Sequence, residues 1–143
     1  MSRLKRICRL VLMLSLVVLI ASGCLLERGD WQYELKDGYT IIRVNAHGIE
    51  LARYNPDWDG YENILNHYYI TDFCMNEAYI GVRGIPTADI WATDEELQSS
   101  NRVYYLVDIS NGNCYGPDSK LEFYNHCEQL STGDLGDWQS TNH

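Results

Sequence analysis

The chain has 143 residues and a formal net charge of −9 at pH 7, and its charges are unevenly placed. The first nine residues hold four basic side chains, whereas the 120 residues from Cys24 onward hold 7 basic and 20 acidic ones, a net charge of −13. A segment of this size forms one domain. Its acidity excludes a nucleic-acid binder that works by neutralising phosphates. The 11 Tyr, 4 Trp and 2 Phe exclude a solvated, disordered chain.

The first 26 residues are typical of a secretory signal. A basic stretch, residues 1–9, precedes an apolar run, residues 10–20. The uncharged segment 10–26 has 17 residues and would span about 25 Å as a helix. That length is short for a bilayer core of about 30 Å, so the pattern favours an export signal over a membrane-spanning helix.

The segment Ile20-Ala21-Ser22-Gly23-Cys24 resembles the lipobox of bacterial lipoproteins. In that family the Cys thiol receives a diacylglycerol, the chain is cut before the Cys, and the new amine is often acylated, as with palmitate. The resemblance implies a signal peptide over residues 1–23 and a lipidated Cys24 with a short tether over residues 24–30. It also implies attachment to a bacterial cell membrane, at the outer face of the cytoplasmic membrane or at the outer membrane. The alternatives are a short transmembrane anchor and a cleaved signal with an incidental Cys.

Strands are predicted for seven segments that are rich in β-formers: 31–35, 39–44, 49–54, 68–73, 78–82, 102–109 and 113–115. Asp37-Gly38 between the first two predicts a tight hairpin, because a primed turn needs positive φ at both central residues. In residues 102–109, Val103, Tyr105 and Val107 alternate with other residues and so share one face of a strand.

A helix of about three turns is predicted after these strands. Ser119 and Glu122 have the capping-box spacing. The apolar residues that follow at helical spacing form one stripe: Phe123, Cys127 and Leu130. Residues 93–99 predict a shorter helix. The fold class is therefore α+β, a mostly antiparallel sheet of about six or seven strands with a C-terminal helix packed on it. Residues 31–130 are expected to form this single domain, and residues 131–143 a loosely ordered tail.

The C-terminal part carries a second resemblance. Residues 105–117 form a strand, an Asn-Gly turn and a Tyr-Gly-Pro segment, and a helix with Phe123 and Cys127 follows. This ending is similar to that of small bacterial lipoproteins grouped in a domain family of unknown function. It covers about a quarter of the chain and implies no activity.

The loop around residue 57 is the most metal-like segment. Asn55, Asp57, Asp59 and Gly60 match the first, third, fifth and sixth positions of a calcium loop. The twelfth position is Asn66 instead of the bidentate Glu. The same residues are also ordinary turn formers, so a solvated turn is the favoured interpretation.

Three cysteines remain once Cys8 in the signal and the lipidated Cys24 are set aside. Because three is an odd number, at most one pair forms within the chain. Cys114 and Cys127 are the predicted disulfide, since they are close in sequence and flank a strand-to-helix turn. Cys74 is the third.

Enzymatic chemistry has weak support in the sequence. A thiolate nucleophile at Cys74 would need a base such as His67 within hydrogen-bond reach and a third group to orient it. Motifs for a serine nucleophile elbow, a phosphate loop or a dinucleotide fold are absent. We therefore expect no enzyme and no cofactor, and we keep a Cys/His-dependent enzyme as an alternative.

Aromatic residues offer the remaining candidate ligand face: Trp58, Trp91, Tyr68 and Tyr104. Exposed Trp and Tyr are enriched at binding hot spots, whereas a small sheet also uses Tyr as a half-buried β-former. The acidity favours a cationic protein partner by long-range steering. We therefore predict a non-catalytic, membrane-anchored binding protein for a basic protein. A module that binds cell-wall glycan through Trp58 and Trp91 is the alternative.

Overall fold

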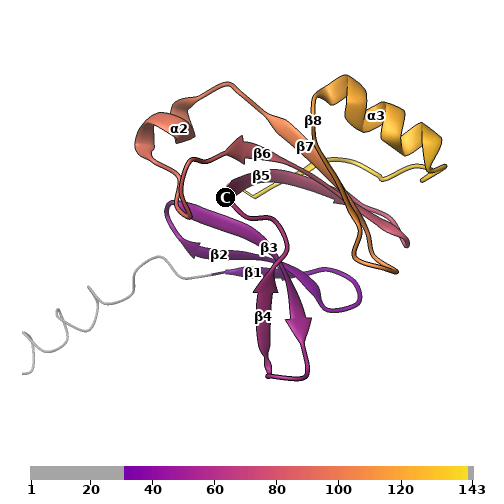
Figure 1. Cartoon of the computed structure of the whole chain (residues 1–143), viewed down its shortest axis with the longest axis horizontal. Helices are drawn as coiled ribbons and strands as arrows, with labels where there is room; N and C mark the ends of the chain where they lie inside the picture. The colour runs from indigo at the N-terminus through magenta and orange to yellow at the C-terminus, as the bar shows by residue number, and fades with distance from the viewer. Residues whose placement is uncertain (1–30, 142–143) are drawn as a thin grey trace, which may run out of the picture.

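The computed structural model describes residues 31–141, which form two antiparallel sheets and two helices (Figure 1). The predicted signal peptide, Cys24 and tether lie outside the described residues. The N-terminal sheet has the strand order β1-β2-β3-β4, and the C-terminal sheet has the order β8-β7-β6-β5-β9. The structure confirms the α+β class and divides the predicted single sheet into two sheets with nine strands.

The N-terminal sheet is built by consecutive hairpins of β1 (Gln32–Glu34), β2 (Tyr39–Asn45), β3 (Gly48–Asn55) and β4 (Gly60–Asn63). Asp37 and Gly38 between β1 and β2 have φ of 54° and 81°, which confirms the predicted turn chemistry. β4 was not predicted, because its short sequence is polar. It forms because it pairs with the second half of β3.

The C-terminal sheet contains β5 (Tyr68–Met75), β6 (Tyr79–Pro86), β7 (Val103–Asp108), β8 (Cys114–Asp118) and β9 (Gln139–Ser140). The side chain of Asn76 closes the β5–β6 turn by accepting hydrogen bonds from the backbone N–H groups of Ala78 and Tyr79, both at 2.9 Å. β6 extends four residues beyond its predicted end at Val82. Gly84 permits this, because a Cβ there would lie 2.1 Å from the carbonyl oxygen of Tyr69.

The C-terminal sheet is buried on both faces, which makes the domain a stack of three layers (Figure 1). Alternate residues of β7 enter different cores: Val107 and Tyr105 pack with the N-terminal sheet, whereas Tyr104 and Leu106 pack under a helix. That helix contributes Phe123, whose side chain is fully buried. The first core therefore joins the two sheets, and the second joins the C-terminal sheet to the helix.

The covering helix is α3 (Lys120–Gln129), and the short helix α2 (Asp94–Gln98) lies between β6 and β7. The capping box predicted at Ser119 is present, and α2 begins with a second one. Ser119 accepts a hydrogen bond from the backbone of Glu122, and Thr93 accepts one from the backbone of Glu96. No helix among residues 31–141 is long and apolar enough to cross a membrane.

The expectation of a loosely ordered tail is wrong for residues 131–141. β9 pairs with β5, and the hydroxyl of Thr141 donates to the carbonyl oxygen of Ile70 at 2.9 Å. The amide of Asn76 donates to the carbonyl oxygen of Thr132 at 2.8 Å. This glycine-rich and acidic segment carries almost no strand pattern, so its attachment depends on contacts with distant residues.

A partly buried ion pair also holds the tail against the sheet. Arg83 on β6 bonds to Asp72 on β5 at 2.9 Å, and its guanidinium lies 5.3 Å from the ring centroid of Trp138. Burial acts to raise the pKa of Asp72, but hydrogen bonds from Arg83 and Thr71 outweigh it and lower that pKa below its ordinary value.

Replacing Phe123 by Ala should lower the free energy of unfolding by about 3–5 kcal/mol, because it leaves a cavity between α3 and the C-terminal sheet. The measurement is urea denaturation. Leu121→Ala is the matched control on the same helix, since Leu121 is 72% exposed and its loss should change stability by less than about 0.5 kcal/mol. Equal losses for the two variants would contradict the packing of α3 on the sheet.

Asp72→Asn should destabilise the protein by about 1–2 kcal/mol at pH 7, because it leaves Arg83 without its charged partner. The lowered pKa of Asp72 means that its contribution is present above the unfolded pKa of about 3.9 and is lost as pH falls through the folded value. Thermal melts between pH 7 and pH 2 should therefore show the difference between wild type and variant shrinking below about pH 4. A difference that is constant with pH would contradict this.

Candidate functional site

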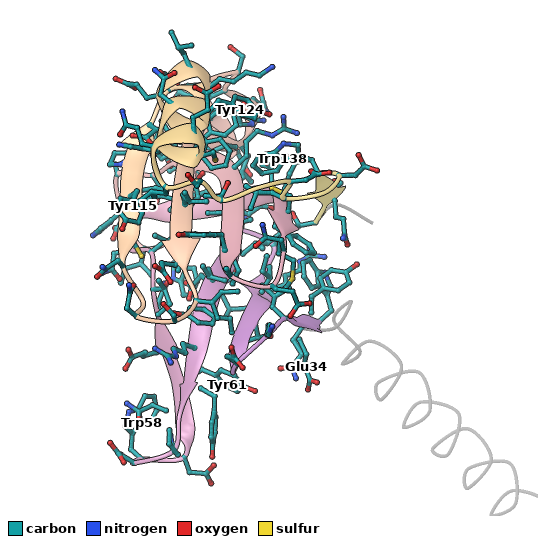
Figure 2. The ribbon with its side chains drawn as sticks, turned by 90° about the vertical axis from the view of Figure 1, so that its right-hand side faces the viewer. Glu34, Trp58, Tyr61, Tyr115, Tyr124 and Trp138 are labelled. Carbon is teal, nitrogen blue, oxygen red and sulfur yellow. The ribbon has the colours of Figure 1, made fainter. Side chains whose placement is uncertain are left out.

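The hairpin of β3 and β4 projects from the end of the molecule opposite to α3. Its tip, residues 54–62, exposes three aromatic side chains: Tyr54 is 39% exposed, Trp58 is 56% exposed and Tyr61 is 42% exposed. Figure 2 shows Trp58 and Tyr61 at this projecting end, far from Tyr124 on α3. Large aromatics exposed together on one hairpin are typical of binding surfaces.

A cross-strand pair of tyrosines stiffens the tip. Tyr54 and Tyr61 are opposite each other in the β3–β4 register, and their rings meet edge to face with 5.7 Å between centroids. The hydroxyl of Tyr54 donates to Oδ1 of Asp59 at 2.7 Å, and this bond raises the pKa of Tyr54. The bond ties the turn to the strand, so the aromatic pair is preorganised.

Trp58 is held by a close approach to glycine. A Cβ on Gly60 would lie 1.9 Å from Cζ3 of the Trp58 ring, so the indole covers the Cα of Gly60. Any larger residue at position 60 would displace the ring. The side chain is thus both exposed and positioned, which lowers the entropy cost of using it for recognition.

Carboxylates surround these aromatics: Glu34, Asp57, Asp59 and Glu62. All four residues are exposed, and within residues 31–141 none of them forms an ion pair. Arg53 is opposite Glu62 in the β3–β4 register but forms no ion pair with it, and it lies over the ring of Tyr39 at 5.0 Å from its centroid. The tip therefore presents uncompensated negative charge beside aromatic rings.

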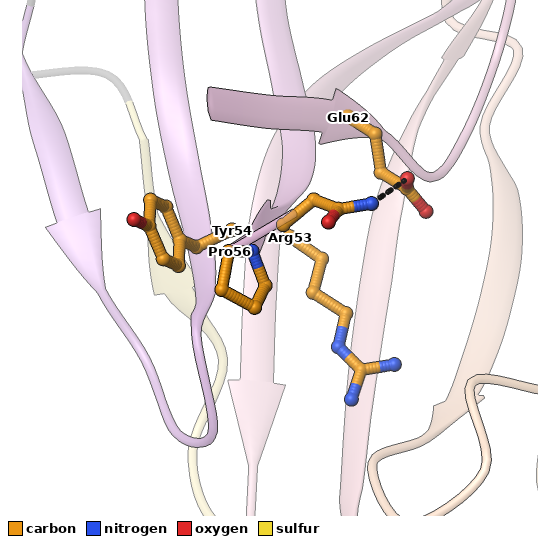
Figure 3. A pocket seen from close by; sticks show the side chains of 5 residues that line it. Arg53, Tyr54, Pro56 and Glu62 are labelled. Carbon is orange, nitrogen blue, oxygen red and sulfur yellow. Dashed lines mark hydrogen bonds between the residues drawn. The ribbon is translucent and has the colours of Figure 1, made fainter. Parts of the chain in front are cut away.

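Two shallow hollows flank the base of the tip. One, of about 250 Å³, is lined in part by Glu34, Tyr54 and Tyr61. The strand register places these three residues on the face of the N-terminal sheet that points away from the core. The other hollow, of about 210 Å³, is lined by Arg53, Tyr54, Asn55, Pro56 and Glu62 (Figure 3). There the amide of Asn55 donates to Oε2 of Glu62 at 3.4 Å.

The predicted ligand face does not assemble as one surface. Tyr68 and Tyr104 are 4% and 7% exposed and belong to the two cores, because the C-terminal sheet is covered on both sides. Trp91 is exposed but packs over Gly48, at the start of β3, where a Cβ would lie 2.5 Å from its ring. Trp58 follows the end of β3, so about 23 Å of strand separates the two indoles.

The calcium-like loop is the turn of this hairpin. Oδ1 of Asn55 accepts the backbone N–H of Asp57 at 3.0 Å, and Asp59 accepts the hydroxyl of Tyr54. Asp59 has φ of 52°, as a tight turn requires. Within residues 31–141 no group of three or more His, Cys, Asp or Glu side chains is arranged to hold a metal ion. The ligand types noticed in the sequence therefore serve the turn.

The predicted Cys114–Cys127 disulfide is absent, and all three described cysteines are free thiols. Cys114 is exposed at the start of β8, with its thiol 3.7 Å from the carbonyl oxygen of Gly112. Cys127 lies on α3 and packs with the second core. β8 and most of α3 separate the two residues, so proximity in sequence does not become contact in the fold.

The Cys/His pairs do not form catalytic dyads either. His67 precedes β5 and Cys74 lies near its end, so about 23 Å of strand separates them. Burial raises the pKa of Cys74 to about 12, which suppresses its thiolate at neutral pH. His126 is adjacent to Cys127, but its Nδ1 lies 2.6 Å from Oδ2 of the buried Asp118.

Tyr54 and Tyr61 are the site residues that sequence reasoning missed. Both lie three residues outside Asp57-Trp58, on either side of a segment with turn chemistry. Symmetric aromatics about a turn indicate a cross-strand pair when that turn is recognised as a hairpin. Glu34 carries no comparable signal, because it reaches the site only through the pairing of β1 with β2.

Comparison with known proteins identifies a family for this chain but assigns no activity to it. No curated protein and no solved structure matches the chain. One family model, described as a protein of unknown function, covers residues 36–135, from the first hairpin turn to the segment after α3. This span includes strands β2 to β8, the hairpin tip and the covering helix. The chain therefore belongs to the DUF3997 family of proteins of unknown function.

Proposed function

We propose that this protein is a lipid-anchored envelope protein that binds a cationic protein through the tip of its β3–β4 hairpin. One observation carries the proposal: Tyr54, Trp58 and Tyr61 are exposed on a projecting hairpin among carboxylates that have no ion-pair partner within residues 31–141. The proposed role is binding alone, without catalysis.

Arginine and lysine side chains on a partner fit this chemistry. A guanidinium stacks favourably on the face of Trp or Tyr, and it forms short, paired hydrogen bonds with a carboxylate. Trp58 stands between Asp57 and Asp59 in the turn, and Tyr61 lines one hollow together with Glu34, so both places offer an aromatic ring and a carboxylate. The net charge of −13 from Cys24 onward adds long-range attraction for a basic surface.

The anchor supports the same role. The lipobox-like segment ending in Cys24 stands seven residues before Trp31, so even a fully extended tether reaches only about 25 Å. A domain attached in this way stays near the membrane. Its acidic tip is repelled by anionic lipid headgroups, so the hairpin is available to proteins close to the membrane surface.

Binding should depend on the tip and on salt. We expect full-length protein, extracted from membranes in mild detergent, to capture a basic protein whose affinity falls at least about tenfold with Trp58→Ala and with Tyr61→Ala. Asp57→Asn with Glu62→Gln should mainly slow association. Raising salt from about 50 to 300 mM should weaken binding, because the attraction is between exposed charges. Quantitative mass spectrometry of captured proteins and surface-binding kinetics measure these effects.

Trp91→Ala is the matched control, since Trp91 is an exposed indole at the other end of β3. It should leave capture unchanged. Capture that responds equally to Trp58→Ala and Trp91→Ala, or that is insensitive to salt, would overturn the hairpin as the binding site. A saturable change in tryptophan fluorescence with cell-wall glycans, lost in Trp58→Ala, would instead favour the glycan-binding alternative.

Lipidation is tested separately. Cells given an alkyne analogue of palmitate should label the wild-type protein and fail to label Cys24→Ser. The variant should also retain residues 1–23, because cleavage in lipoproteins follows lipid transfer to the Cys. Intact-protein mass spectrometry distinguishes the processed from the unprocessed chain. An unlabelled wild-type protein that stays with the membrane would point to a transmembrane anchor.

A further inference from the structure

Two thiols from distant parts of the chain meet beneath α3. Cys74 on β5 and Cys127 on α3 line the same hollow of about 270 Å³, which lies between α3 and residues 133–138. Cys74 is 1% exposed, and Cys127 is half-buried. Figure 2 shows α3, with Tyr124, and the tail, with Trp138, on the same side of the C-terminal sheet.

Phe123 connects the two cysteines. A Cβ built on Gly81 would lie 2.8 Å from the sulfur of Cys74 and 3.0 Å from Cζ of Phe123, so that sulfur is next to the tip of the Phe123 ring. Cys127 follows Phe123 by four residues, one turn along the same face of α3. Cys127 packs against the core cluster to which Cys74 and Phe123 belong.

Cys127 also affects the pKa of Cys74. Burial raises the pKa of Cys74, and the neighbouring Cys127 raises it further. Cys114, by contrast, adds to the effect of burial in raising the pKa of Tyr39 and of Tyr105, which belong to the core between the sheets. Of the three described cysteines, Cys74 and Cys127 are therefore the neighbouring pair.

We propose that Cys74 and Cys127 form an intramolecular disulfide when the protein meets a thiol–disulfide oxidant, and that this bond fixes α3 to the C-terminal sheet. Cys127 reacts first because it is accessible. Its thiolate attacks the oxidant's disulfide, forms a mixed disulfide and expels one thiolate. The Cys74 thiol then loses its proton as its sulfur attacks the sulfur of Cys127, and the second thiolate of the oxidant leaves. This second step is the slow one, because burial keeps the Cys74 thiol protonated at neutral pH. The two protein thiols lose two electrons and two protons, and the oxidant becomes two thiols.

The proposal is independent of any partner for the hairpin. Disulfide oxidants of this class act in compartments outside the cytoplasm, where an exported lipoprotein would reside. The bond would link residues 53 positions apart, so it would restrict the unfolded chain strongly. We expect the oxidised protein to melt about 10 °C above the reduced one.

Trypsin separates the three cysteines cleanly. Cleavage at Arg53, Arg83, Arg102 and Lys120 places Cys74 on peptide 54–83, Cys114 on 103–120 and Cys127 on 121–143. Full-length protein in detergent is treated with glutathione disulfide, free thiols are blocked with N-ethylmaleimide, and the digest is analysed by mass spectrometry. The proposal expects peptides 54–83 and 121–143 joined, with a mass about 2 Da below their sum.

Three single variants separate the outcomes. Cys114→Ser should leave the crosslink unchanged. Cys127→Ser should abolish it, and Cys74→Ser should trap glutathione on Cys127 because the resolving thiol is missing. If Cys74→Ser does not fold, the half-buried Cys127→Ser still provides the test. Joined peptides 103–120 and 121–143, or full alkylation of Cys74 and Cys127 after oxidation, would overturn the proposal.

Discussion

The C-terminal sheet is apolar on both faces, and the rest of the described chain is arranged to cover them. On β7, Val107 faces the N-terminal sheet and Leu106 faces α3, and both are fully buried. A strand that must serve two cores has no position left for a ligand-binding side chain. This is why Tyr68 and Tyr104 are structural, whereas Tyr54, Trp58 and Tyr61 are exposed on the hairpin that projects from the stack.

Local chemistry made much of the fold predictable. Asp37-Gly38 adopts the positive φ values that the hairpin requires, and Ser119 caps α3 with Glu122. The division into two sheets could not be predicted in this way. The alternation of apolar residues along a strand shows that a face is buried, but it does not show which layer covers that face. β4 and β9 were missed for a related reason: each is short and polar, and each is stabilised by pairing with a longer strand.

In the candidate site, too, features set by neighbouring residues could be predicted from the sequence, whereas features set by strand pairing could not. Trp58 and its turn were predictable as exposed, since Pro56, Asp57 and Gly60 favour a turn. The partnership of Tyr54 with Tyr61 needed the register of β3 and β4, and Glu34 needed the pairing of β1 with β2. The cysteine pairing also depended on distant contacts, since Cys127 shares a hollow with Cys74, far away in sequence, and not with Cys114. Closeness in sequence therefore did not predict which side chains are in contact between two layers of the fold.

The attachment of β9 covers part of one edge of the C-terminal sheet. β5 is the outermost long strand of its sheet, and its unpaired backbone groups could template another chain. β9 pairs with Asp72 and Phe73, and the backbone N–H of Thr141 donates to the carbonyl oxygen of Thr71. Residues 139–141 therefore cover part of a strand edge that would otherwise be prone to aggregation. A purification tag fused close to these residues, or their removal by proteolysis, would expose that edge of β5 while leaving both cores intact.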